Sequence, residues 1–464
     1  MARTTIRTED ITADAVTAAK LASGAVPGVT ANQDDIALLG FKVAANGSLA
    51  RYNLVDQSID AFEDASGVDA SASTNEVRNA SNYYYGESSV TPSITSNEDS
   101  TGTDGDYTWY KWTTVTGSGS YVNDTTQDHE YLIVAGGAGG GGSVSGAGAG
   151  GGGAGGYRTA AALSLVGGTT YTVAVGAGGA AGAVGANDGS SGSSSSLSGS
   201  DITDVTSAGG GGGGSATPST NANGLDGGSG GGAGGSGSGA SGGTGGASSP
   251  VTSPVQGYAG GDSTGGGYGA GGGGSSAAGS DGGGGAGGAG TSNDITGASV
   301  TYGVGGSATS GHGSGSAGAA NTGDGGDGGG QVFAGSAGGS GIVVLRRLTG
   351  PVLVEGADMT LISNAQTAES APTNGDLVMT ITNGAGTTTP NTDIKAYITR
   401  DGSDYTTAVT LVDQGDTGGH TILTANGVDL SGETSGTSMR WKITTHNQSA
   451  SKTTRIQAVS LGWS

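Results

Sequence analysis

The residues that most often carry catalysis are sparse in this chain, and their spacing indicates no active site. The four histidines, His129, His312, His420 and His446, are not spaced as metal ligands. Serine and aspartate are so frequent that no Ser-His-Asp set stands out. The motif Gly-x-Gly-x-x-Gly recurs, but no strand-helix-strand pattern surrounds it, so it indicates no dinucleotide site. We therefore predict no catalytic residue, no metal site and no cofactor.

Two acidic segments carry the oxygen ligands that Ca²⁺ prefers. Residues 99–106 read Asp-Ser-Thr-Gly-Thr-Asp-Gly-Asp, and residues 401–404 read Asp-Gly-Ser-Asp. Neither segment matches the loop of an EF-hand. The alternative interpretation, a solvated turn, fits their composition better.

Isolated aromatic residues in glycine-rich surroundings are the candidates for ligand contacts. Exposed rings can stack on sugar faces or on apolar groups of a receptor, whereas the alternative is that they pack on the flank of their domain. These aromatic residues are Tyr157, Tyr258, Tyr268, Tyr302 and Phe333. We select Tyr258, Tyr268 and Tyr302 as receptor-binding candidates, with Asn223 and Asp226 as their polar partners.

Composition favours an extracellular or virion structural protein over an enzyme. Glycine accounts for 104 of 464 residues, and aromatic residues for 5%, so the middle of the chain cannot bury a conventional side-chain core. The formal net charge of -23 would repel nucleic-acid phosphates, so we expect no nucleic-acid partner. No run of eighteen apolar residues occurs and the first residues lack an apolar signal segment. We expect neither membrane insertion nor conventional secretion.

A glycine tract from Gly136 to Gly341 dominates the chain, and two apolar runs bracket it. Residues 131–135 (Tyr-Leu-Ile-Val-Ala) and 342–346 (Ile-Val-Val-Leu-Arg) have the composition of β-strands. We predict that these two strands pair, because the tract then starts and ends on one scaffold. If these strands pair, deleting Gly136 to Gly341 and joining the strands by a short turn should leave a folded sandwich.

A glycine tract is able to form packed helices of the polyproline II type, known as polyglycine II, because no Cβ keeps neighbouring backbones apart. Such helices have three residues per turn and no internal hydrogen bonds, so their backbone groups must pair with neighbouring helices. We expect alanine and serine on outward faces, and surface loops at the longer breaks, which are 187–207, 217–226, 248–258 and 291–302. The alternative is a flexible, disordered tract.

The remaining sequence divides into regions of distinct character. Residues 66–128 and 349–464 alternate apolar with polar side chains between turn residues such as Asn383-Gly384, which predicts antiparallel β-sandwich parts on both sides of the glycine-rich domain. Residues 29–65 form a connector with two helical or irregular patterns, at 33–40 and 52–65. Residues 1–28 have apolar residues every five positions, a spacing that fits neither a heptad nor a regular strand. Their register resembles the N-terminal segments of phage fibre proteins, and the alternative is a disordered arm.

The ordered succession of glycine motifs resembles the glycine-rich domain of phage tail-fibre and adhesin proteins over residues 129–348. The motifs are Glu130-Tyr-Leu-Ile-Val-Ala-Gly-Gly, Gly152-Gly-Ala-Gly-Gly-Tyr157, Tyr171-Thr-Val-Ala-Val and Gly338-Gly-Ser-Gly-Ile-Val-Val-Leu-Arg. Residues 60–82 and 449–463 are similar to virion fibre proteins of marine bacteriophages. In the distal adhesins of T-even phages, polyglycine II helices pack together and the segments between them contact the receptor. This chain departs from them by carrying β-rich parts on both sides.

The resemblance implies a protein of the phage particle surface, and three function classes compete. The first is a fibre that binds a host surface glycan or outer-membrane protein. The second is a structural head fibre, collar or decoration protein without receptor binding, and the third is a glycan-degrading tailspike, for which no β-helix repeat is visible. We expect a homotrimer, because phage fibres commonly have threefold symmetry. Residues 1–28 would then attach it to other tail or capsid proteins.

Overall fold

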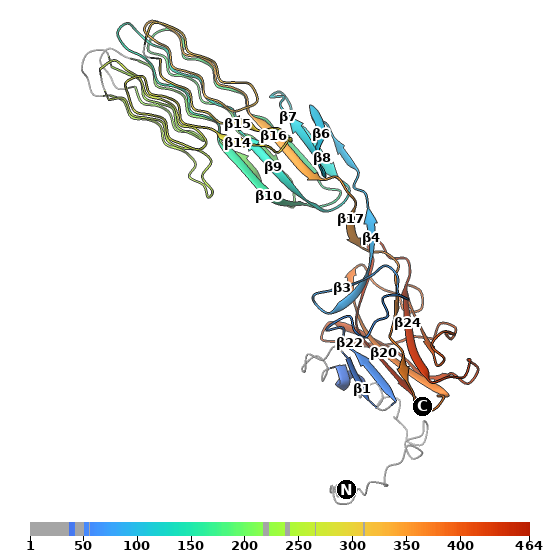
Figure 1. The fold of residues 1–464 in the computed structure, drawn as a ribbon. Helices are drawn as coiled ribbons and strands as arrows, with labels where there is room; N and C mark the ends of the chain where they lie inside the picture. The colour runs from blue at the N-terminus through green and yellow to red at the C-terminus, as the bar shows by residue number, and fades with distance from the viewer. Residues whose placement is uncertain are drawn as a thin grey trace, which may run out of the picture. The chain divides into compact units, whose positions relative to one another are not determined.

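The computed structural model describes residues 37–41, 51–54, 56–216, 222–236, 242–264, 266–309 and 311–464. The chain forms two compact units, one made by the residues up to Val90 together with Leu353–Ser464, and the other by Thr91–Val352. Both are built of antiparallel β-strands, which confirms the predicted fold class (Figure 1). Within the described residues, no helix is long and apolar enough to cross a membrane. The segment 1–28 lies outside the described residues.

The first unit is a sandwich of a nine-stranded and a four-stranded sheet. The larger sheet has the order β1 (Arg51–Leu54), β2 (Gln57–Asp60), β25 (Thr453–Trp463), β20 (Asn374–Ala385), β23 (His420–Asp429) and β22 (Val412–Thr417), with β3 (Glu76–Asn79), β4 (Tyr83–Val90) and β17 (Val352–Glu355) attached beside β25. The smaller sheet contains β18 (Thr360–Ile362), β24 (Ser438–Thr445), β19 (Gln366–Thr367) and β21 (Ile394–Thr399). Met439, Trp441 and Ile443 alternate inward along β24 and pack against β20 and β25.

The helical or irregular element expected over residues 52–65 is wrong for residues 52–60, because these residues belong to the hairpin of β1 and β2. Asp56 makes the turn with a φ of 61°, and Ile59 pairs with Ser460 of β25. Ile59 is fully buried there, so sheet pairing and burial outweigh the local helical spacing. Of the helix expected over 33–40, the described part is a helical segment at 37–41. Its Ala37 and Phe41 pack on Ile59, on the other face of the sheet from Trp441.

The second unit has two five-stranded sheets that share one core. The first sheet has the order β10 (Tyr157–Leu165), β9 (Gln127–Val134), β16 (Ile342–Leu348), β7 (Tyr107–Trp112) and β6 (Ser100–Asp104), and the second has the order β13 (Val205–Ser207), β12 (Ser195–Ser198), β11 (Thr170–Ala174), β8 (Gly119–Asn123) and β5 (Ile94–Ser96). Tyr110, Ile133 and Leu345 of one sheet pack against Tyr171 and Leu197 of the other. The β-rich sequence of residues 66–128 is therefore divided between the two units.

The predicted pairing at the two ends of the glycine tract is confirmed. Strands β9 and β16 are antiparallel neighbours, with Val134 opposite Ile342 and Glu130 opposite Arg346. The Arg346 guanidinium contacts the Glu130 carboxylate at 2.5 Å and so reinforces this register. The tract thus begins and ends on adjacent strands.

The tract is nevertheless more than an insertion between these two strands. Strands β10 to β13 lie within it, and β11, β12 and β13 belong to the second sheet. Part of the expected surface loop 187–207 is strand, and the loop expected at 291–302 is the hairpin of β14 (Thr291–Asn293) and β15 (Val300–Tyr302). The tract supplies half of the shared core, so we expect, contrary to the prediction from the sequence, that the scaffold does not fold without it.

The glycine runs form a lattice of polyglycine II helices, and its evidence is a hydrogen-bond period of three. In the run 136–143, the N–H groups of Gly136, Gly139 and Gly142 bond to residues 193, 190 and 187. Those of Gly137 and Gly140 bond to residues 339 and 336, and those of Ala138 and Gly141 bond to residues 153 and 150. Three successive residues thus donate in three directions, as a threefold helix requires.

Two runs, 135–143 and 148–156, form the centre of this lattice. The carbonyls of Gly136, Gly137 and Ala138 accept from residues 210, 179 and 326, so this run has neighbours on six sides. Both central runs are buried along their length. Close approach explains the glycine content, since a Cβ on Gly152 would lie 2.2 Å from the Ala138 carbonyl oxygen.

The expectation that alanine and serine face outward is wrong for much of the lattice. Ala138, Ala149 and Ala154 are fully buried, at positions where the neighbouring helices leave room for a methyl group. Buried serines also complete hydrogen bonds within the lattice, as when the Ser229 hydroxyl donates to the Gly274 carbonyl at 3.1 Å. Ordering glycine costs about 1–2 kcal/mol per residue, so this dense pairing is what makes the tract fold.

Candidate functional site

The lattice has one end at the β-sheets and another end where the runs turn back (Figure 1). We define the tip as residues 144–147, 184–186, 266–268 and 331–333, which connect runs at the end away from β9 and β16. Hydrogen bonds hold these turns side by side. The Ser143 N–H donates to the Phe333 carbonyl at 3.0 Å, and the Gly185 N–H donates to the Ser143 carbonyl at 3.1 Å. The Gly148 N–H donates to the Gly267 carbonyl at 2.8 Å.

Apolar side chains are exposed at this tip. The exposed fraction is 58% for Val184, 45% for Tyr268, 50% for Val332 and 37% for Phe333. Because they stand on hydrogen-bonded turns of a rigid lattice, a partner would find them already ordered. The tip is therefore the best candidate for a contact surface within the second unit.

Val332 adds a second signal at the tip, because its backbone is strained. Its φ of 59° lies in the left-handed region, which β-branched residues rarely adopt. Such a conformation costs on the order of 1–3 kcal/mol and is typical of functional positions. Glycine or asparagine would adopt this φ at a lower energetic cost. Because the Val332 side chain is half exposed, its packing in the folded chain does not offset the strain.

The predicted tyrosines do not form one site. Tyr268 lies at the tip, whereas Tyr258 is 39% exposed but lies near the sheet end of the neighbouring run. The N–H groups of Tyr258 and Gly261 pair with the carbonyls of Gly274 and Gly271, which places Tyr268 level with Thr264. Six residues at about 3.1 Å each separate the two tyrosines by roughly 19 Å along the lattice.

The assignment of Tyr302 to an exposed contact is wrong. Its exposed fraction is only 3%, and it packs with Leu132, Ile342 and Val344. The hairpin of β14 and β15 presses this ring onto the outer face of β9 and β16. Tyr302 therefore covers an apolar sheet face instead of facing solvent. The half-buried Tyr157 packs against the same cluster, and its hydroxyl accepts a hydrogen bond from the Asn293 amide at 2.9 Å.

Asn223 and Asp226 are exposed, but their side chains complete the lattice edge. The Asn223 Oδ1 accepts from the Thr244 N–H at 2.9 Å, and the Asp226 Oδ1 accepts from the Ala247 N–H at 2.7 Å. The two acceptor residues are three positions apart, and so are the two donor residues, so both side chains bind the same neighbouring run. They do not lie beside Tyr268 at the tip.

Acidic residues also accept hydrogen bonds from backbone N–H groups elsewhere along the lattice edge, a role that was not predicted from the sequence. Asp324 and Asp327 accept from the N–H groups of Val304 and Ser307 at 2.8 and 2.7 Å. Burial raises the pKa of Asp324, although several backbone N–H groups hold its carboxylate. The signal in the sequence is the spacing of three in Asn-Gly-Leu-Asp and Asp-Gly-Gly-Asp, which equals the helical period.

Of the two acidic segments considered for Ca²⁺, residues 99–106 consist mostly of strand β6, and residues 401–404 form a hydrogen-bonded turn. The Asp99 carboxylate accepts from the N–H groups of Thr113 and Thr114 at 2.6 and 2.8 Å. The Asp401 carboxylate accepts from the N–H groups of Ser403 and Asp404, which holds the pKa of Asp401 well below its usual range. In the described part of the chain, no group of three or more His, Cys, Asp or Glu residues could hold a metal ion.

His129 is buried in the core of the second unit, with an exposed fraction of 1%. Its Nδ1 lies 3.0 Å from the Gln127 carbonyl, which can only accept, so Nδ1 carries the proton. Nε2 then accepts from the Tyr121 hydroxyl at 2.7 Å. Burial lowers the pKa of His129 to about 4, because the charged imidazolium would lose its hydration.

This histidine predicts that acid destabilises the second unit. Between its ordinary pKa of 6.5 and the folded value of about 4, the unfolded chain binds a proton that the folded unit excludes. The free energy of unfolding should therefore fall by up to about 3 kcal/mol as the pH decreases through this window. Denaturant unfolding at several pH values would measure it. A His129→Gln variant should lack this component, and an unchanged pH dependence in that variant would contradict the assignment.

Comparison with known proteins identifies the glycine segment. Residues 113–347 match the model of a family described as a glycine-rich domain. The matched segment contains β8 to β15, nearly all of β16, and the glycine lattice. It therefore includes β9 and β16, the two paired strands at the ends of the glycine tract. Neither the curated proteins nor the solved structures gave a match.

Proposed function

Since the chain belongs to the glycine-rich domain family, we propose that it is a non-enzymatic phage fibre protein that binds a host-cell surface receptor through the tip of its lattice. The observation that carries this proposal is the group of exposed apolar side chains on ordered turns at that tip. Aromatic anchors on a rigid support lose little conformational entropy on binding. The receptor is a surface glycan or an outer-membrane protein.

The same proposal extends to assembly. The fibre is a homotrimer on the phage particle, and residues 1–28 attach it to other tail or capsid proteins. The strain at Val332 supports receptor binding over the second candidate, a structural head fibre, collar or decoration protein, because a spacer has no use for a strained and exposed apolar residue.

The test is a double variant, Tyr268→Ala with Phe333→Ala, in the phage particle. Both side chains are exposed, so we expect unchanged thermal unfolding and assembly. Adsorption to host cells should fall by about tenfold or more, as for the loss of two aromatic anchors at an interface. The readout is the adsorption rate constant.

The matched control is Val251→Ser with Val255→Ser. These side chains are 88% and 53% exposed, but they lie in the loop at the sheet end of the lattice. The control should adsorb as the wild type does. If the tip variant also adsorbs normally, the structural appendage becomes the better assignment.

A further inference from the structure

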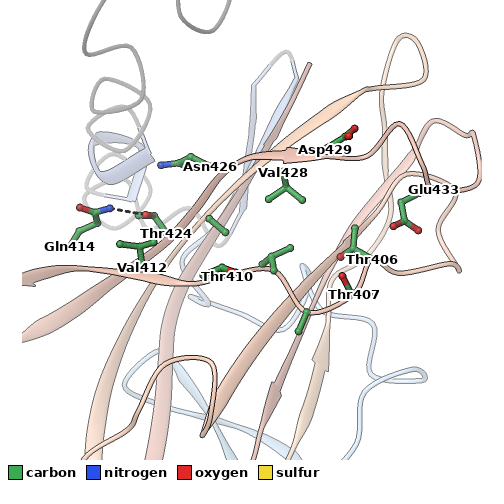
Figure 2. A pocket seen from close by; sticks show the side chains of 13 residues that line it. Thr406, Thr407, Thr410, Val412, Gln414, Thr424, Asn426, Val428, Asp429 and Glu433 are labelled. Carbon is green, nitrogen blue, oxygen red and sulfur yellow. Dashed lines mark hydrogen bonds between the residues drawn. The ribbon is translucent and has the colours of Figure 1, made fainter.

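A groove opens in the first unit where β22 separates from β23 (Figure 2). Val412 pairs with Thr424, but β23 continues to Asp429 beside β20. The chain before Val412 instead crosses to the smaller sheet, where the Val409 N–H donates to the Ala396 carbonyl at 2.9 Å. The space between the two diverging segments has a volume of about 590 Å³, which suits a small-molecule ligand.

The walls of this groove are fixed by hydrogen bonds and by the core. The Asn391 amide donates to the Leu411 carbonyl at 2.8 Å and accepts from the Leu411 N–H at 2.7 Å. On the other wall, the Arg400 guanidinium donates to the Glu433 carbonyl at 2.6 Å. Val409 and Leu411 are buried in the core cluster of the sandwich. The groove is therefore formed before any ligand arrives, which lowers the entropy cost of binding.

The lining combines an apolar centre with polar ends. Val428 projects between Gln414 with Thr424 at one end and Glu433 with Thr406 at the other (Figure 2). The Gln414 amide donates to the Thr424 hydroxyl at 3.0 Å, which holds this amide group in place at one end of the groove. All lining residues lie in the described segment 406–433, and none of them is basic.

We propose that this groove binds a neutral saccharide unit. Hydroxyl groups of a sugar both donate and accept, so they suit threonine hydroxyls, the Gln414 amide and the Glu433 carboxylate. The C–H face of a sugar ring would lie on Val412 and Val428. Asp429 and Glu433 disfavour acidic sugars and phosphates through charge repulsion.

A peptide that adds a strand to β23 is the less suitable ligand. The β20–β23 register shifts between Gly375 and Leu377, and Gly427 has a φ of 60°. Such a bulge interrupts the flat edge that strand addition requires. The saccharide site does not include the lattice tip, so the proposal of saccharide binding is tested independently of the proposal of receptor binding at the tip.

The test is saturation-transfer NMR on the full chain with glucose, galactose and N-acetylglucosamine as probes. We expect at least one of them to bind, with a Kd on the order of 1 mM, and glucuronic acid to give no signal. The double variant Gln414→Ala with Glu433→Ala should weaken binding about tenfold or more. Glu369→Ala, an exposed position outside the groove, is the matched control and should bind as the wild type does. Thermal unfolding of each variant verifies the fold.

Three results would overturn the proposal. They are the absence of saturation transfer from every neutral sugar, undiminished binding by the folded double variant, and tighter binding of an extended peptide or of trilysine than of any sugar. The last result would assign the groove to peptides or amines.

Discussion

A single isopropyl group at the centre of the lattice should strongly destabilise the second unit. In a Gly152→Val variant, the new Cβ would lie 2.2 Å from the Ala138 carbonyl oxygen, and both atoms belong to central runs that cannot move apart without breaking bonds to their other neighbours. We expect the free energy of unfolding of the second unit to fall by about 4 kcal/mol or more. In a unit of this size, the midpoint temperature of thermal unfolding should fall by roughly 10 °C.

The control for this variant is Gly313→Ala. A Cβ at Gly313 meets no atom within 4 Å and its φ is not in the left-handed region, so we expect a small change in either direction. Calorimetry on both variants separates close packing from a general effect of replacing glycine. Equal behaviour of the two variants would mean that the central runs are not held in contact.

Replacing residues 136–341 by an Asn-Gly turn should prevent folding of the second unit. The excision removes Tyr171, Val173 and Leu197 from the shared core, so Tyr110 and Trp112 lose the residues that cover them. Joining β9 directly to β16 in a hairpin does not replace that buried area. Burial of each large apolar side chain contributes about 1.5–3 kcal/mol to the free energy of unfolding. We expect the Trp112 indole N–H signal in an NMR spectrum to collapse into the unfolded region.

The first unit provides an internal control in the same molecule. Its core cluster around Trp441 contains no residue of 91–352, so the Trp441 signal should stay at its native position. A dispersed Trp112 signal after the excision would show that one sheet folds without the strands in the tract, and would contradict the prediction.

The candidate site was only partly accessible from sequence, for an identifiable reason. The exposure of Tyr268 and the burial of Tyr302 follow from their places in the fold, yet both are isolated aromatic residues among glycines. Tyr302 precedes a lattice run and follows a turn that folds onto β9 and β16, a long-range contact without a local signature. Val332 was overlooked because its strain exists only in the folded turn.

Elements with a local or periodic cause could be predicted from the amino-acid sequence. The β-branched runs at 131–135 and 342–346 predicted strands that pair. The glycine motifs, through their resemblance to phage adhesins, predicted the polyglycine II lattice, in which only glycine permits such close approach of the backbones. Other features depend on contacts between residues far apart in the chain. The hairpin of β1 and β2 overrode a helical spacing through burial of Ile59 against β25. Strands inside the tract contribute half of the core residues of the second unit. The groove beside β23 lies where the chain before β22 leaves the larger sheet of the first unit. These features depend on which distant segments meet, and composition and spacing do not encode that choice.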